Sequence, residues 1–209
     1  MKIAKEGYPL IFTGAALTTV AAVASWKFAS GVLGLTSLAI AAFFRDPERR
    51  IPMGEGLVVS PADGKVVSIA DVSSGSPFAD AATRVSIFLS PLDVHINRMP
   101  VAGRVEEVSY QPGEFLPAYK ETASERNERN SLKVIDPQER LFGVIQIAGV
   151  LARRIVCWVK PGDVLQRGDR LGLIMFGSRT DLYLPRGFKL EVRQGQKVKG
   201  GETIVGRWE

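Results

Sequence analysis

The sequence predicts a mainly β domain preceded by a pair of apolar helices. Two long apolar stretches lie within the first 50 residues, and short β-branched runs separated by glycine and proline fill the rest. The 209 residues are enough for one substantial core. The expected organisation is a membrane-associated helical hairpin at residues 1–50, followed by one β domain at residues 51–209.

The two apolar stretches span residues 8–26 and 28–44. Each is close to the roughly 17 to 20 residues that a helix needs to cross a bilayer. Small residues on both stretches, among them Gly14 and Ser37, would let two helices approach closely in lipid. Basic residues precede the first stretch and follow the second, which favours a cytoplasmic location for both ends and for the β domain.

Two other interpretations of this segment are weaker. A signal peptide needs one short apolar core and a small-residue cleavage site, but here a second apolar stretch follows and ends in Arg-Asp-Pro. A buried helix pair would be amphipathic, whereas these stretches are apolar on all sides. The charged residues at 45–50 are expected to anchor the second helix at the interface or to attract anionic lipid.

Several later runs have strand length, β-branched residues and turn residues at their ends. They lie at residues 57–59, 65–69, 84–89, 104–108, 142–147, 154–159 and 171–175. The segment 121–130 is almost wholly polar and is expected to form a solvated loop.

A weak internal repeat aligns residues 162–171 with residues 195–204 and keeps both glycines of each segment. Such runs resemble the hairpin turns of lipoyl-like domains. The expected fold is therefore mainly β, a barrel-sandwich (lipoyl-like) domain behind the helical hairpin, and this likeness concerns architecture and not function.

Composition limits the classes of partner. The net charge of +5 favours anionic partners such as acidic lipid headgroups. The basic residues are scattered among acidic ones, so nucleic-acid binding is not expected. The single Cys157 cannot form an internal disulfide and is expected to be a buried thiol in a reducing compartment. One histidine and one cysteine offer no ligand set, so no metal is expected.

Three residues are candidates for chemistry. A Gly-Ser peptide in a strained turn can be attacked by its own serine hydroxyl because glycine does not shield the carbonyl, and Gly177–Ser178 lies between an apolar run and a polar tail. His95 is the only histidine, the side chain best suited to proton transfer near neutral pH. Asp63 precedes a glycine, which is also a common hairpin-turn signal. Each therefore also has a purely structural interpretation.

Four motifs together resemble the phosphatidylserine decarboxylase proenzyme family, in its short bacterial and archaeal form, over nearly the whole chain. They are Phe-Phe-Arg-Asp-Pro-Glu-Arg at 43–49, Ser-Pro-Ala-Asp-Gly at 60–64, Ser-Pro-Leu-Asp-Val-His-Ile-Asn-Arg-Met-Pro at 90–100 and Met-Phe-Gly-Ser-Arg-Thr-Asp at 175–181. The resemblance implies self-cleavage between Gly177 and Ser178, with Ser178 becoming the pyruvoyl group of the small chain. It further implies that this group forms a Schiff base with phosphatidylserine, whose decarboxylation yields phosphatidylethanolamine.

The resemblance also implies roles for three other residues. His95 would orient the substrate carboxylate or return a proton during decarboxylation. Asp63 would hydrogen-bond the base that activates Ser178. Arg98 stands where the long form of the family has a second histidine; an arginine cannot act as a base, but it could bind the lipid phosphate or carboxylate. Either His95 performs both tasks, or another group replaces the second histidine.

The expected protein is a pyruvoyl-dependent decarboxylase of a serine phospholipid at the cell membrane, with its catalytic domain on the cytoplasmic side. Its large and small chains would come from one proenzyme. The alternative is a membrane-anchored barrel-sandwich adaptor without catalytic activity, whereas a lipoyl-like metallopeptidase would need a cluster of histidines. The choice between diacyl and archaeal ether lipid stays open, as does the pairing of two copies as a homodimer.

Overall fold

The computed structural model describes residues 2–72, 78, 81–118, 123–150, 154–175 and 178–208. The chain divides into two compact units, Met1–Glu48 and Arg49–Glu209. The first unit is helical and the second is mainly β, so the predicted fold class is confirmed at this level.

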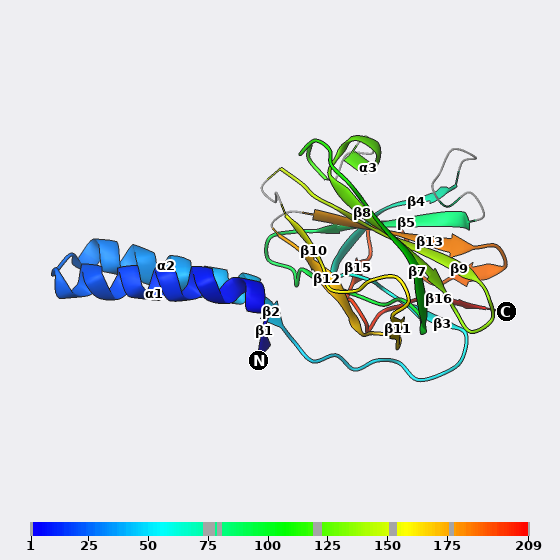
Figure 1. Cartoon of the computed structure of the whole chain (residues 1–209), viewed down its shortest axis with the longest axis horizontal. Helices are drawn as coiled ribbons and strands as arrows, with labels where there is room; N and C mark the ends of the chain where they lie inside the picture. The colour runs from blue at the N-terminus through cyan, green and yellow to red at the C-terminus, as the bar shows by residue number, and fades with distance from the viewer. Residues whose placement is uncertain are drawn as a thin grey trace. The chain divides into compact units, whose positions relative to one another are not determined.

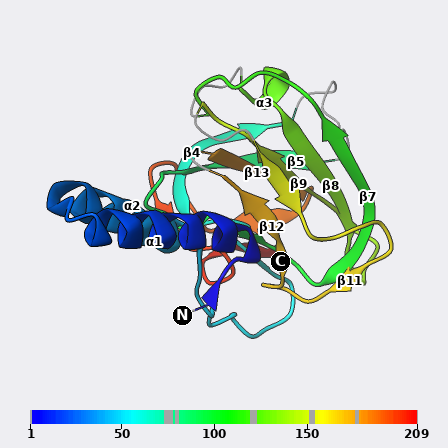
Figure 2. The same cartoon turned by 60° about the vertical axis from the view of Figure 1, so that its left-hand side comes forward.

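The helical unit is a hairpin of α1 (Tyr8–Val23) and α2 (Lys27–Phe43). The two helices lie side by side along their length (Figure 1 and Figure 2). A Cβ atom on Gly14 would lie 2.3 Å from Ser37 Oγ, so the two helices approach closely there and a larger residue would have to displace the Ser37 side chain. The predicted close approach through small residues is therefore confirmed.

The ends of the hairpin are joined by a short ladder. Strand β1 (Lys2–Ile3) pairs antiparallel with β2 (Arg45–Asp46), and a 3-10 turn, η1 (Lys5–Gly7), leads into α1. Within the described residues, none of the helices combines the length and the apolar character needed to cross a membrane.

The β unit contains one large sheet and two small ones, all with antiparallel pairing. The eight-stranded sheet has the order β11 (Val164–Leu165), β7 (Gly103–Gln111), β8 (Arg129–Ile135), β9 (Leu141–Ile147), β13 (Ser178–Pro185), β5 (Ala81–Leu89), β4 (Gly64–Asp71), β15 (Lys197–Val198). The three-stranded sheets are β10 (Ile155–Cys157), β12 (Arg170–Ile174), β6 (Ile96–Arg98) and β14 (Phe188–Leu190), β16 (Ile204–Trp208), β3 (Leu57–Val59). The short helix α3 (Ala123–Arg126) precedes β8.

The main core lies on one face of the large sheet. Successive strand residues point to opposite faces, so the alternate residues Thr180, Leu182 and Leu184 of β13 share a face. Leu182 and Leu184 pack in the main core with apolar residues of β5, β8 and β9, and with Val58, Leu171 and Val205 of the small sheets. The opposite face carries a smaller cluster that includes Ile145, Ile147 and Tyr183. Strand β13 is consequently buried on both sides.

Every strand predicted from β-branched runs is present, as β3, β4, β5, β7, β9, β10 and β12. Two expectations are wrong. The segment after Ser178 is not a polar tail but the buried strand β13, and residues 127–130 are not a solvated loop, since Asn127, Glu128 and Asn130 are buried. Residues 121 and 122 of that expected loop lie outside the described part of the chain.

The internal repeat is visible as two similar turns. Gly162 and Gly168 have φ angles of 94° and 87°, and the aligned Gly195 and Gly201 have φ angles of 88° and 78°. The strands between each pair of glycines, β11 and β15, form the two edges of the large sheet. Between those edges the described strands form an open sheet and not a closed barrel, so the barrel-sandwich arrangement remains a prediction.

Candidate active site

Ser178 begins β13 on the face that points into the main core. Its backbone is in register with Leu89 of β5, and its side chain is fully buried. The Oγ atom has no hydrogen-bond partner among the described residues. Leaving a buried hydroxyl unsatisfied costs free energy, which is unusual for a residue with only a structural role. The strained turn expected at Gly177 lies outside the described residues.

A series of hydrogen bonds between buried polar side chains ends at Thr180, two residues after Ser178 on β13. Asn130 of β8 donates to Gln146 of β9 (3.0 Å), and Gln146 donates to the Asn97 Oδ1 atom (2.9 Å). Asn97 of β6 donates in turn to the Thr180 hydroxyl (2.9 Å). Each amide donates to the next member, so Thr180 accepts at the end of the series and keeps its own proton to donate.

His95 lies just before β6 and is buried. Its Nδ1 atom is 3.0 Å from the backbone carbonyl oxygen of Asp93. Because a carbonyl oxygen only accepts, the contact assigns the proton to Nδ1, and Nε2 is the nitrogen left to act as a base. The Asp93 carboxylate is fixed in turn by the N–H and the hydroxyl of Ser90, at 2.8 and 2.6 Å.

The Asn97–Thr180 hydrogen bond connects the strands that carry His95 and Ser178. His95 lies two residues before Asn97, and Ser178 lies two residues before Thr180. Two residues of extended chain span about 7 Å. The His95 carbonyl accepts from the Ile174 N–H (3.3 Å), so the extended pairing of β6 with β12 continues to His95. The Asn97–Thr180 bond thus holds β6 next to β13, and a direct contact between His95 and Ser178 remains a prediction.

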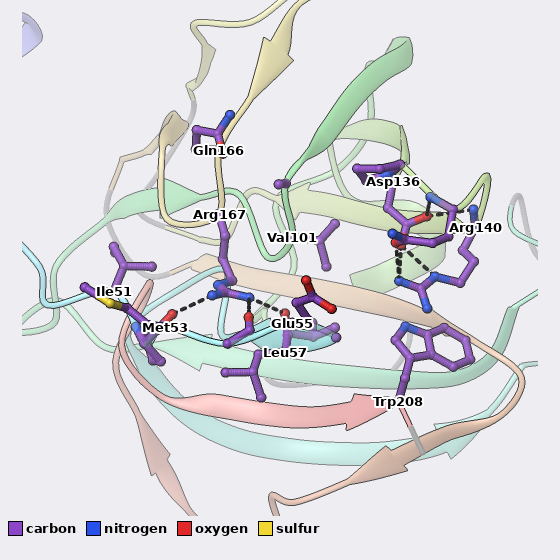
Figure 3. Close-up of a pocket in the computed structure, with 17 residues that line it drawn as sticks. Ile51, Met53, Glu55, Leu57, Val101, Asp136, Arg140, Gln166, Arg167 and Trp208 are labelled. Atoms are coloured by element: carbon purple, nitrogen blue, oxygen red, sulfur yellow. Dashed lines mark hydrogen bonds and ion pairs between the residues drawn. The ribbon is translucent and has the colours of Figure 1, made fainter.

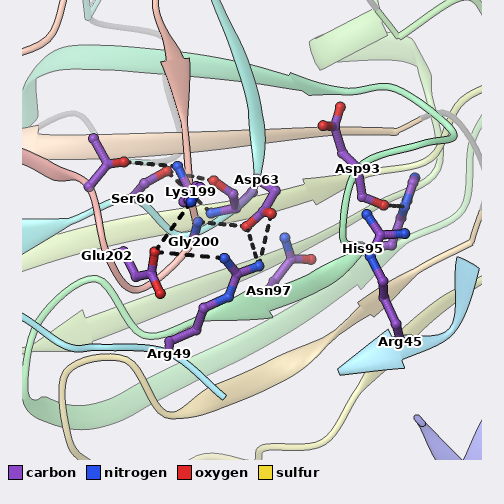
Figure 4. Close-up of polar contacts among 12 residues, drawn as sticks. Arg45, Arg49, Ser60, Asp63, Asp93, His95, Asn97, Lys199, Gly200 and Glu202 are labelled. Atoms are coloured by element: carbon purple, nitrogen blue, oxygen red, sulfur yellow. Dashed lines mark hydrogen bonds and ion pairs between the residues drawn. The ribbon is translucent and has the colours of Figure 1, made fainter. Parts of the chain in front are cut away.

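Asp63 is held by three hydrogen bonds (Figure 4). Arg49 Nη2 donates to both carboxylate oxygens at 2.9 and 2.8 Å, and the Gly200 N–H donates to Oδ1 at 2.7 Å. Burial raises the pKa of Asp63, and the Arg49 guanidinium and the Gly200 N–H lower it, but the balance stays above the ordinary value. The hydrogen bonds of this carboxylate do not include His95, so its predicted bond to the base remains a prediction.

The motif around Asp63 lies next to the motif around His95. The Pro61 carbonyl accepts from the Arg98 backbone N–H at 2.9 Å and from the Asn97 side chain at 3.5 Å. The Arg98 guanidinium is buried and donates to the Gly168 carbonyl at 2.9 Å. Binding of substrate by Arg98 remains a prediction.

Sequence reasoning missed four residues of this region: Arg49, Asn97, Gln146 and Thr180. Arg49 was expected to face a membrane interface, which is wrong, because its side chain is only 7% exposed and is paired with Asp63. Gln146 carried a usable signal, since it is a single amide in the otherwise apolar strand β9. Asn97 and Thr180 lie inside the recognised motifs and show no separate signal.

A cavity of about 570 Å³ lies elsewhere in the β unit, between loop 51–58 and Trp208 (Figure 3). Arg167 donates there to the carbonyls of Pro52, Gly54 and Leu57, and the Arg140 guanidinium stacks over the Trp208 ring at 4.2 Å. The residues that line this cavity include none of the predicted site residues. Its arginines bind the protein itself, so it is a structural cavity and not the candidate active site.

Comparisons with known proteins identify the family of this chain. The family model described as phosphatidylserine decarboxylase matches residues 37–206. A relative from Syntrophus aciditrophicus is 46% identical over 209 residues, which cover 98% of this chain and 96% of the relative. Relatives from Geotalea uraniireducens (45%) and Symbiobacterium thermophilum (47%) each match 98% of this chain and 95% of their own length. All three are named phosphatidylserine decarboxylase proenzyme. The chain therefore belongs to the phosphatidylserine decarboxylase family.

Proposed function

We propose that this protein decarboxylates phosphatidylserine to phosphatidylethanolamine and makes its pyruvoyl group from Ser178 by self-cleavage. Family membership over nearly the whole chain supports the reaction. The single structural observation that carries the proposal is the buried Ser178 Oγ without a partner among the described residues, at the start of a central strand. A residue converted into a reactive carbonyl there would stay out of bulk water.

We propose that His95 and Asp63 act in the conversion of Ser178. In the proposed first step the Ser178 hydroxyl attacks the Gly177 carbonyl and transfers its proton to Nε2 of His95. The Ser178 nitrogen then leaves the carbonyl as an amine, and the protonated His95 supplies its proton, so that an ester replaces the peptide bond. Asp63 orients the base in this step. Elimination then breaks the ester bond and releases the large chain with the Gly177 carboxylate as its end. The dehydroalanine left at position 178 becomes an imine, and water hydrolyses it to the pyruvoyl group of the small chain and ammonia.

The mature site needs a group that accepts electrons and a group that moves a proton. When present, the pyruvoyl carbonyl supplies the electron sink for the pair left by departing carbon dioxide. His95 holds at Nε2 the proton that the substrate α-carbon receives. Arg98 remains the proposed contact for the lipid phosphate or carboxylate.

We also propose that residues 1–50 attach the enzyme to the cytoplasmic face of the cell membrane and that residues 51–209 form the decarboxylase domain, with a barrel-sandwich architecture. Large apolar side chains are exposed along both helices, among them Phe12, Val23, Phe28 and Leu35. Such a continuous apolar surface is typical of a segment that binds a membrane or a partner. Homodimer formation remains a prediction, which light scattering of the purified enzyme tests.

The proposed activity is tested with purified protein and vesicles of phosphatidylserine in phosphatidylcholine. We expect release of carbon dioxide and formation of phosphatidylethanolamine by the wild-type chain, and neither by Ser178→Ala. An uncut wild-type chain that binds the vesicles without turnover would favour the alternative of an adaptor. Vesicles with diacyl and with ether-linked serine lipids, compared in the same assay, identify the preferred lipid backbone.

A further inference from the structure

Arg49 is the first residue of the β unit, and its guanidinium is buried against Asp63. The two side chains are 7% and 14% exposed. Arg49 Nη1 lies 4.0 Å from the Glu202 carboxylate. The Arg49 Nε atom is buried and has no hydrogen-bond partner among the described residues. The neighbouring Arg50 is exposed, and its backbone N–H donates to Glu202 at 3.2 Å.

Stability is a poor explanation for this pair. The cost of removing two charges from water is comparable to their mutual attraction, and here one guanidinium donor also stays unused. Apolar side chains of the same volume would hold the chain at least as well. What only this pair provides is a fixed carboxylate, because Arg49 Nη2 contacts both carboxylate oxygens and the Gly200 N–H donates to Oδ1, and these contacts together determine the orientation of Asp63.

The pair also affects the charge of Asp63. Burial and the nearby Asp93 carboxylate raise the pKa of Asp63, whereas Arg49 lowers it. Glu202 lies on the far side of Arg49, so its charge acts on Asp63 at longer range. Arg49 is the cation in contact with the carboxylate, and its removal would favour the protonated, uncharged form.

We propose that Arg49 is a positioning residue for self-cleavage, which holds the Asp63 carboxylate ionised and in the orientation that it needs to act on the base of Ser178. This inference rests on the proposed function, since it assumes that Asp63 assists the cleavage. It gives the arginine at the end of the Phe-Phe-Arg-Asp-Pro-Glu-Arg motif a role in the chemistry and not at a membrane surface.

The test uses full-length chains made by cell-free synthesis, with the loss of uncut chain followed by denaturing electrophoresis across a pH series. We expect Arg49→Gln to move the pH profile of cleavage to higher pH by about one unit, so that at pH values below the Asp63 pKa the rate falls by up to about tenfold. Its rate should approach that of the wild type at high pH and that of Asp63→Asn at low pH. Arg49→Lys, which keeps the charge, should show a smaller shift in the same direction. The matched control Arg50→Gln, which removes the same charge from an exposed position, should follow the wild type.

Two results would overturn the inference: a wild-type pH profile for Arg49→Gln, or slowing by the same factor at every pH, as a purely structural role predicts. If thermal unfolding shows that Arg49→Gln does not fold, the profile of Arg49→Lys decides in the same way, and an unshifted profile rejects the proposal. Failure of the proposed function looks different, because then the wild-type chain stays uncut or Ser178→Ala is cut. Cleavage of Asp63→Asn at the wild-type rate would remove Asp63, and the inference with it.

Discussion

Asn97 donates a 2.9 Å hydrogen bond to the Thr180 hydroxyl, and this bond connects the small sheet that carries His95 to the large sheet that carries Ser178. Asn97 and Thr180 are fully buried. The bond ends the series of hydrogen bonds that starts at Asn130, so it fixes the two strands on which the proposed chemistry depends. Its removal should therefore affect stability and cleavage together.

Thr180→Val removes only the hydroxyl and keeps the shape of the side chain. It leaves the Asn97 amide donor buried without its partner, so we expect a loss of about 1–3 kcal/mol in the free energy of unfolding. Thr180→Ser, which keeps the hydroxyl, is the matched control and should lose less. Urea unfolding of both variants in a Ser178→Ala background, where every chain stays uncut, measures the difference. Equal stability of the Val variant and its parent would show that the bond does not stabilise the fold.

We expect the intact Arg49–Asp63 pair to contribute little to the free energy of unfolding, whereas the loss of only one partner should destabilise the fold. In the Ser178→Ala background, single replacement by Arg49→Met or Asp63→Leu should cost about 3–5 kcal/mol, because each leaves an uncompensated buried charge. The double replacement should be within about 1 kcal/mol of the parent or more stable. Chemical unfolding of the four chains measures this cycle. Additive losses in the double variant would mean that the two side chains have no coupling energy, which would contradict this account of the pair.

The difference in stability between the parent and the double variant should also depend on pH. The pKa of folded Asp63 is raised above 3.8, so between 3.8 and its folded value the folded chain binds more protons than the unfolded chain. The contribution of this group to stability is present at low pH and is lost as the pH rises through that window. The parent should therefore lose stability relative to the double variant as the pH rises from 3.8. A constant difference between the two chains at all pH values would contradict the raised pKa.

Strand β13 was not predicted because its first buried positions are filled by polar residues. The apolar strands were recognisable by their β-branched residues, but β13 begins Ser-Arg-Thr-Asp and reads as a polar tail. Hydrogen bonds satisfy several of its buried polar side chains, and two of the partners, Ser86 and Asn97, lie far away in sequence. Arg179 binds Asp181 and Ser86, and Thr180 binds Asn97. Local patterns do not contain such pairings.

In the candidate site, too, the sequence identified some residues and missed others. Motif resemblance was sufficient to select Ser178, His95 and Asp63, because their residue types carry recognisable chemistry. It was not sufficient for Arg49, because an arginine after an apolar helix has an obvious interfacial interpretation. Only the folded chain places its guanidinium against Asp63.

His95→Ala tests whether one histidine performs both steps. Since Nδ1 donates to the Asp93 carbonyl, Nε2 is the basic atom, and Arg98 at the position of the second histidine is engaged with the Gly168 carbonyl. We therefore expect His95→Ala to stay uncut. Mass spectrometry of the denatured chain detects cleavage. Normal cleavage without turnover would restrict His95 to the decarboxylation step and assign the activation of Ser178 to another group.

Deletion of residues 1–44 tests the proposed role of the helical hairpin. We expect the shortened chain to lose membrane binding, because it lacks the exposed apolar side chains of both helices. It should still cleave itself, since Arg49, Asp63, His95 and Ser178 are retained. Turnover of bilayer substrate should fall more than turnover of a short-chain soluble analogue, because attachment raises the effective concentration at the surface. Vesicle flotation and parallel assays measure both effects, and an equal loss on both substrates would place the hairpin within the catalytic unit.

The most direct measurement of the central claim is the intact mass of the purified, denatured wild-type protein. We expect two chains, one ending at Gly177 and one beginning at position 178, with the second lighter than the serine-started peptide and blocked to amino-terminal sequencing. Ser178→Ala should give one uncut chain. A single full-length wild-type chain with full decarboxylase activity would contradict the formation of a pyruvoyl group from Ser178.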